Sequence, residues 1–185
     1  PEVADAVTGA TPLAAVKGAL LGGMPMSEAM QMVSYQDLLL GIKSGSFGEV
    51  SAVALLLGGV YLLIRRVISW RIPIAVLGSM AIFTGILWAV NPDAYMSPLF
   101  HLLTGGAMLG AIFMATDYST SPMTHKGMLL FGAGIGIITI LIRLWGIYPE
   151  GRSFAILIMN AMVPLIDRSF KPKRFGVVKA GRAKA

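Results

Sequence analysis

Five long apolar runs, separated by short polar connections, make up most of the chain after residue 49. The runs lie at residues 50–64, 72–90, 99–115, 127–145 and 153–166. A helix needs about 20 apolar residues to cross the hydrocarbon core of a bilayer, so the first and last runs must include flanking residues to cross it. The pattern predicts an all-α integral membrane protein with about five transmembrane helices.

The first 49 residues have a different pattern, in which short apolar stretches alternate with Gly, Pro, Ser and Thr. Residues 12–23 begin with Pro12 and end in a glycine pair, which is typical of a short helix with proline at its first position. A second helix is expected over residues 27–40, with Ser27 as its N-cap and Gly41 after its end. We expect this segment to pack on the helix bundle at the membrane surface.

Composition agrees with a membrane protein, because 56% of the 185 residues are hydrophobic and only 13% are charged. The chain has no cysteine, which excludes disulfides, iron–sulfur ligation and thiolate metal sites within it. Its two histidines, His101 and His125, are too few and too far apart to indicate a metal centre. Seven of the fifteen Lys and Arg residues follow Ile166, so the net charge of +6 reflects a basic tail rather than a nucleic-acid surface.

The basic residues also predict the orientation of the chain in the membrane. The connection after the first run contains Arg65, Arg66 and Arg71, whereas the connection at 91–98 has no Lys or Arg. By the positive-inside rule the first connection and the C-terminal tail are cytoplasmic, and residues 1–49 lie outside. Those residues carry five acidic and two basic side chains, a net charge of −3, which fits an outer position.

These patterns divide the chain into an outward-facing segment (1–49), a five-helix transmembrane bundle (50–168) and a basic cytoplasmic tail (169–185). The first residue is not Met, and nothing before Val50 has the pattern of a signal peptide. We therefore expect the chain to be the C-terminal part of a longer membrane protein.

Glycines and polar residues within the apolar runs have mainly structural interpretations. Gly105, Gly106 and Gly110 have the spacing of a small-residue helix contact surface. Gly132–Gly136, "GAGIG", lacks the spacing and the preceding strand of a nucleotide-binding loop. Arg143 is expected to extend its charge to the membrane surface. His101 is expected at the interface, with proton shuttling as a minor alternative.

Three further polar positions have a structural interpretation and a functional alternative. Asn160 is expected to hydrogen-bond to a neighbouring helix, with a role near a cofactor or ion path as the alternative. Glu49 fits a capping carboxylate near a helix N-terminus, or a residue of a cation path. Asp117 and Thr120 fit a capped turn, with ion access as the alternative.

The polar stretch "DAVTGATP" precedes the first predicted helix. Thr11 stands immediately before Pro12 and is therefore an N-cap candidate, whose hydroxyl should meet the free N–H groups of Leu13 and Ala14. A helix N-terminus also binds anions, so the alternative is that the Thr11 hydroxyl carries a phosphate group held by the same N–H groups.

The stretch "DAVTGAT" resembles the flavin attachment motif of the D subunit of the Rnf electron-transport complex and of the related B subunit of the sodium-pumping NADH:quinone oxidoreductase. The segments "GSFGEVSAVALLLGGVYLL", "FMATDYSTSPMTHKG" and "IYPEGRSFAILIMNAMVPLID" are similar to the Rnf D subunit in the same order. The resemblance implies that Thr11 bears FMN through a phosphoester bond. Asp5, Thr8, Gly9 and Ala10 match the rest of the motif.

The resemblance also implies a function and a setting. The function is that of a membrane subunit of a ferredoxin:NAD+ oxidoreductase that couples electron transfer through covalent FMN to Na+ or H+ translocation. The expected location is the bacterial cytoplasmic (inner) membrane, with Thr11 on the outer or periplasmic side and the C-terminus in the cytoplasm. Implied partners are the A and E membrane subunits, the flavinylated G subunit, the B and C iron–sulfur subunits, and a flavin-attaching enzyme.

The fold implied by the resemblance is one of two five-helix repeats similar to those of urea transporters. That fold leaves an alternative function open, a non-redox channel or permease subunit that binds no flavin. No residue has the pattern of a catalytic acid or base or of a metal ligand, so enzyme activity would belong to the whole complex.

Overall fold

The computed structural model describes residues 11–31, 33–41, 51–92, 94–146, 148 and 150–171. Every regular element in these residues is a helix, as the sequence predicts. Two of them, α5 (Arg71–Val90) and α8 (His125–Trp145), are long and apolar enough to cross a membrane, and the other helices are shorter. The described part of the chain is therefore an all-helical structure consistent with a membrane protein.

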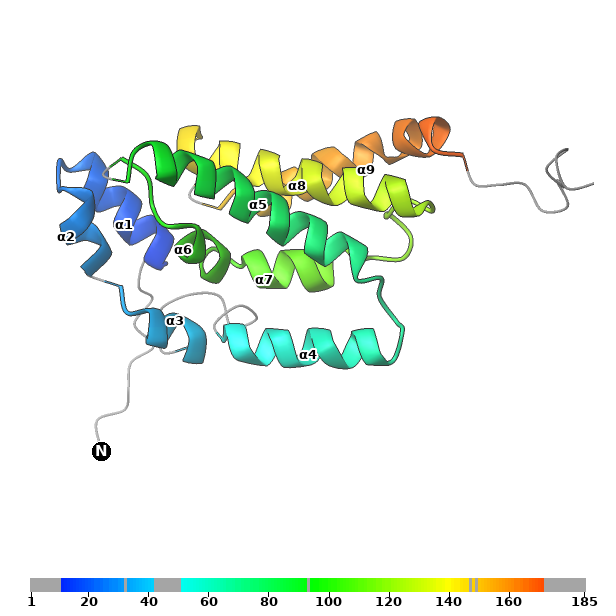
Figure 1. Cartoon of the computed structure of the whole chain (residues 1–185), viewed down its shortest axis with the longest axis horizontal. Helices are drawn as coiled ribbons and strands as arrows, with labels where there is room; N and C mark the ends of the chain where they lie inside the picture. The colour runs from blue at the N-terminus through cyan, green and yellow to red at the C-terminus, as the bar shows by residue number, and fades with distance from the viewer. Residues whose placement is uncertain are drawn as a thin grey trace, which may run out of the picture.

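Four of the five apolar runs form helices whose ends lie within three residues of the predicted ends. They are α4 (Ala52–Ile64), α5, α8 and α9 (Arg152–Ser169). In Figure 1, α5, α8 and α9 lie along one side of the molecule and α4 along the opposite side. The connection between α4 and α5 and the start of α8 lie at one end of the bundle, away from α1 (Figure 1).

The third apolar run is not a continuous helix, contrary to the prediction. It forms α6 (Pro98–Leu103), then α7 (Ala107–Leu109), which continues directly into the π-helix η2 (Gly110–Met114). The interruption is caused by Gly105 and Gly106, whose φ angles of +58° and +57° are left-handed. The two parts of this interrupted segment lie between α5 and α4 (Figure 1).

The segment before the bundle forms short helices at the other end of the molecule (Figure 1). The first, α1 (Pro12–Leu21), agrees with the predicted helix. The predicted helix at 27–40 is wrong, because this stretch forms α2 (Met26–Gln31) and α3 (Tyr35–Leu40). Consequently Ser27 lies within α2 and is not its N-cap, whereas Gly41 ends α3 in a left-handed conformation.

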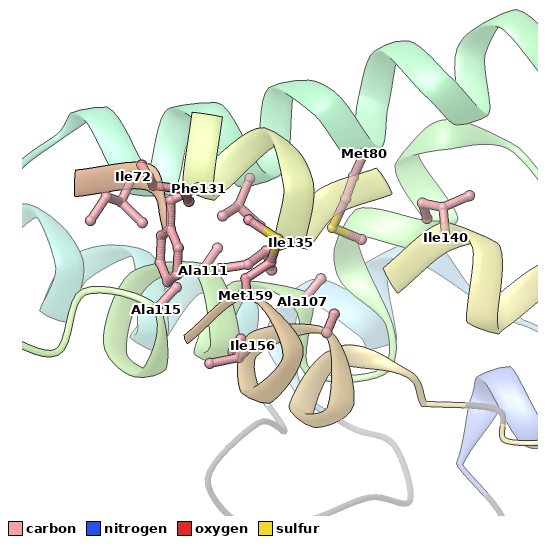
Figure 2. Close-up of a cluster of buried hydrophobic side chains, with 13 residues drawn as sticks. Ile72, Met80, Ala107, Ala111, Ala115, Phe131, Ile135, Ile140, Ile156 and Met159 are labelled. Atoms are coloured by element: carbon pink, nitrogen blue, oxygen red, sulfur yellow. The ribbon is translucent and has the colours of Figure 1, made fainter. Parts of the chain in front are cut away.

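The main core lies between the long helices and the second part of the interrupted segment. It joins Ile72 and Met80 of α5, Phe131 and Ile135 of α8, and Met159 of α9 (Figure 2). All five side chains are buried. This apolar core positions the end of α8 and the start of α9, which carry the two arginines described below.

Glycines allow α8 to approach α5 closely. A Cβ atom at Gly132 would lie 2.6 Å from Ala75 Cβ, and one at Gly136 would lie 2.7 Å from the carbonyl oxygen of Val76. "GAGIG" is therefore part of a helix–helix contact and not a nucleotide-binding loop, as the sequence indicates. Contacts of this kind let helix backbones pack together where side chains would keep them apart.

Candidate cofactor attachment site and the interrupted helix beside it

Thr11 is the N-cap of α1, as predicted. Its backbone is extended, Pro12 occupies the first helical position, and its Oγ1 accepts a hydrogen bond from the N–H of Ala14 at 3.3 Å. The Thr11 side chain is half-buried. The hydroxyl therefore lies at the start of a helix, where unsatisfied N–H groups gather.

The start of α1 has two features that favour a bound anion. The first turn of α1 contains no acidic residue that would compete for the N–H groups. The helix dipole favours a negative charge at this end. The other motif residues, Asp5, Thr8, Gly9 and Ala10, lie outside the described residues, as does Glu49.

Apolar contacts attach α1 to the first part of the interrupted segment. Leu13 and Val16 are buried in a second core, which also contains Phe100 and Leu103 of α6. A Cβ atom at Gly105 would lie 3.0 Å from Leu13 Cδ2. The helix that begins at Thr11 therefore packs directly on the interruption between α6 and α7.

A lysine attaches α1 to the end of α8. The Lys17 ammonium donates hydrogen bonds to the carbonyl oxygens of Arg143 at 3.0 Å and Gly146 at 2.5 Å. These carbonyls belong to the last turn and C-cap of α8, which have no partner within the helix and favour a cation. Burial lowers the pKa of the Lys17 ammonium from its usual value.

Two buried arginines bind the backbone at the interruption. The Arg143 Nη1 donates to the carbonyl oxygen of His101 at 2.6 Å. Its Nη2 donates to the carbonyl oxygens of Thr104 at 3.1 Å and Gly105 at 3.0 Å. Arg152 Nη1 donates to the same Gly105 oxygen at 2.5 Å. The carbonyls released where α6 ends are thus satisfied by two cationic side chains.

The positions of three of these residues correct the predictions. Arg143 is buried and does not extend to the membrane surface. His101 is also buried rather than interfacial, and its Nδ1 has no hydrogen-bond partner within the described residues. Gly105 does not form a helix contact surface, because its left-handed conformation brings its carbonyl oxygen to the two arginines.

Gly106 also differs in role from the prediction, because it shares the left-handed interruption. The prediction is confirmed for Gly110, which begins η2 and packs closely against Arg152 at the start of α9. The sequence contains one signal for Arg143, since a charged residue inside an apolar run is costly unless it is used, whereas Arg152 precedes the last apolar run. The positive-inside rule treats such arginines only as markers of orientation and does not predict their burial.

Other predicted polar roles have mixed outcomes. The buried Asn160 Oδ1 has no hydrogen-bond partner within the ranges that the structure describes, so the predicted bond to a neighbouring helix is not observed. The capped turn at Asp117 is confirmed, because its carboxylate accepts hydrogen bonds from Ser119 at 2.7 Å and Thr120 at 3.1 Å. The Ser119 hydroxyl, followed by that of Thr120, lowers the pKa of the exposed Asp117 carboxyl.

Comparison with known proteins shows which family the chain belongs to. The model of the NQR2, RnfD, RnfE family matches residues 1–176. The D subunit of the Na(+)-translocating ferredoxin:NAD(+) oxidoreductase complex of Acetobacterium woodii is 48% identical over 177 residues, which are 95% of this chain and 51% of the relative. The D subunit of the proton-translocating complex of Clostridium ljungdahlii is 44% identical over 174 residues, 93% of this chain and 52% of the relative.

A third relative is the D subunit of the ion-translocating oxidoreductase complex of Halorhodospira halophila. It is 42% identical over 179 residues, which are 96% of this chain and 50% of the relative. The chain therefore spans about half the length of the curated relatives it matches. The names of these relatives include both Na+ and H+ as the translocated ion.

Proposed function

The chain belongs to the NQR2, RnfD, RnfE family, and on that premise we propose that it functions as part of a membrane subunit of a ferredoxin:NAD+ oxidoreductase. The complex would couple electron transfer to translocation of Na+ or H+. The observation that carries this proposal is the 48% identity over 95% of the chain to the D subunit of such a complex. Activity belongs to the assembled complex, in which the A, B, C, E and G subunits are the proposed partners.

We further propose that the Thr11 Oγ1 is the attachment point of FMN. The flavin-attaching enzyme would direct the Thr11 Oγ1 onto the flavin-side phosphorus of a flavin adenine dinucleotide donor. The Oγ1–P bond would form as the P–O–P bond breaks, so that AMP leaves and the hydroxyl proton is released. The N–H groups in the first turn of α1 would then hold the phosphate, and Asp5, Thr8, Gly9 and Ala10 would form the motif that the attaching enzyme reads. FMN supplies electron transfer when bound, while the protein supplies position.

The setting follows from the same premise. The chain would form a five-helix unit of urea-transporter-like topology in the bacterial inner membrane, with the interrupted segment counted as one span. The arginines of the connection between α4 and α5 support a cytoplasmic location for that end of the bundle. The helix α1, which lies at the opposite end (Figure 1) and has Thr11 as its N-cap, would then lie on the periplasmic side.

The test is in-gel flavin fluorescence of the denatured full-length subunit, produced in cells that contain the flavin-attaching enzyme. We expect a fluorescent wild-type band and a dark Thr11→Ala band. Thr11→Asn is the sharper variant, because asparagine caps a helix as well as threonine does but has no hydroxyl to esterify. It should also be dark while α1 stays folded.

Thr124→Ala is the matched control, since Thr124 caps α8 through the same contact, from its Oγ1 to the N–H of Gly127 at 3.1 Å. Its band should remain fluorescent. A dark wild-type band, in cells where a control protein is flavinylated, would contradict the attachment and favour the permease alternative. Fluorescence in Thr11→Asn would place the flavin on another residue.

A further inference from the structure

Two adjoining hollows lie at the corner where α4 ends and α5 begins. One, of about 580 Å³, is lined by the α4–α5 connection, the start of α5 and the 116–121 connection. The other, of about 130 Å³, is an apolar groove between α4 and α5. Leu63 and Ile68 line both hollows, so the two are neighbours. We call them together the α4–α5 corner site.

The larger hollow is basic. Arg66 and Arg71 both line it, and none of the residues that line it is acidic. Arg71 lies over the Trp70 ring, with its guanidinium carbon 5.1 Å from the ring centroid, and donates to Ser69 Oγ at 3.4 Å. In the described part of the chain no carboxylate pairs with either arginine. Their positive charge is thus available to an anion, and guanidinium groups match phosphate well.

Arg66 adopts an unfavourable backbone conformation at this corner. Its φ of +56° makes it the only residue other than glycine with a positive φ among those that the structure describes. It follows Arg65, the C-cap of α4, at a position that glycine or asparagine usually occupies. Strain of this kind is typical of sites where the side chain has a role. Here the strained residue places an arginine beside the hollow.

The smaller hollow can receive a hydrocarbon chain. Leu56, Val60 and Ile74 are among its lining residues, and the other residues that line it are also apolar. Val60 and Ile74 are 51% and 58% exposed, so the groove opens to the surface of the described bundle. Trp70, beside the basic hollow, is 53% exposed and has the character of a side chain at the boundary between lipid and water.

We propose that the α4–α5 corner site binds one anionic phospholipid. Its phosphate would interact with Arg66 and Arg71, and part of one acyl chain would lie in the groove lined by Val60 and Ile74. Basic pockets between membrane helices bind anionic head groups in this way. An apolar groove beside the basic hollow distinguishes this site from one for a free anion, which needs no groove.

The test is native mass spectrometry of the full-length subunit, released from purified and delipidated complex. Phosphatidylglycerol and phosphatidylcholine with identical acyl chains are the probes. We expect wild type to prefer phosphatidylglycerol, and the double variant Arg66→Gln/Arg71→Gln to lose roughly fivefold in affinity for each arginine removed. Arg65→Gln is the matched control, because Arg65 is exposed on the same connection but does not line the hollow.

Two further variants keep the result interpretable. Arg66→Gly removes the charge and suits the positive φ, so it should fold at least as well as wild type yet bind phosphatidylglycerol more weakly. Val60→Trp fills the groove and should weaken phosphatidylglycerol binding with both arginines present. Flavin fluorescence at Thr11 should stay unchanged in all variants, so failure of lipid binding and failure of the proposed function are separate results.

Equal binding of the two lipids by wild type would overturn the proposal. So would unchanged phosphatidylglycerol binding in the double variant or in Val60→Trp. Inorganic phosphate is the remaining probe. If it displaces phosphatidylglycerol at equal concentration, the hollow is a free-anion site and the lipid assignment is wrong.

Discussion

The α5–α8 contact and the α6–α7 interruption both depend on glycine, but in opposite ways. In α8, Gly132 and Gly136 keep helical geometry and let two backbones approach. Between α6 and α7, Gly105 and Gly106 leave helical geometry and release carbonyl groups. The surroundings of the glycines decide whether the backbone stays helical. In the first region the glycines of α8 face the neighbouring helix α5, and in the second they lie beside buried arginines.

The energetic consequences of the two regions differ as well. The α5–α8 contact is stabilised by close packing along an apolar surface. The interruption is stabilised by hydrogen bonds from Arg143 and Arg152, which satisfy carbonyls that would otherwise be buried without a partner. Removing the stabilising group should therefore cost more at the interruption than at the contact.

The largest expected effect is that of Arg143→Met. It removes the guanidinium from three carbonyl oxygens and should lower the free energy of unfolding by on the order of 4 kcal/mol. Thermal unfolding of the full-length subunit in mild detergent measures this change. Arg65→Met, at an exposed arginine, is the control and should change the melting temperature little. Equal melting temperatures for the two variants would mean that the interruption does not need Arg143.

The next effect is that of Gly136→Ala, which tests the α5–α8 contact. The added methyl would overlap Ser79 Oγ and lie 2.7 Å from the Val76 carbonyl oxygen, so the helices must separate, at a cost of up to about 3 kcal/mol. Gly78→Ala is the control on α5, where an added Cβ meets no atom within 4 Å. It should be neutral or stabilise by up to about 1 kcal/mol. The same unfolding assay compares them, and a harmless Gly136→Ala would show that the contact is loose.

The smallest effect is expected from Gly105→Ala, at about 2 kcal/mol. Part of this loss is the strain of a side chain at positive φ, about 1 kcal/mol. The rest comes from contacts of the new methyl with Leu13 and with Arg143 Nη2, which would be 2.7 Å away. Gly23→Ala isolates the strain, because Gly23 has a φ of +87° and an added Cβ there meets nothing within 4 Å. If both variants lose the same stability, the contacts at Gly105 are unimportant.

Apolar periodicity predicts the parts of the fold that depend on local sequence. The ends of α5 and α8 follow from their apolar runs, and the start of α1 follows from Thr11 and Pro12. The break at Gly105 cannot be predicted in the same way, because a glycine pair suits a close helix contact and a left-handed turn equally well. Its outcome depends on Arg143 and Arg152, which lie 38 and 47 residues further along the chain.

The candidate site is predictable to the same extent. The capping role of Thr11 needs only its immediate neighbours, and its prediction is confirmed. The attachment of α1 to α8 joins Lys17 to Arg143 and Gly146, which lie 126 and 129 residues further along the chain. Nothing local in the sequence indicates this contact. Asn160 makes no hydrogen bond to a neighbouring helix within the described residues for a related reason, since the sequence of one helix does not specify what lies opposite it.

The double attachment of α1 has a consequence for any group bound at its first residue. Leu13 anchors the start of the helix on the interruption, and Lys17 anchors its later part on the end of α8. A helix held at two places about 6 Å apart along its axis cannot tilt or rotate freely. The attachment point of a cofactor esterified to Thr11 would thus be held in place by the fold, so that only the bonds of the Thr11 side chain and of the cofactor itself remain to be ordered.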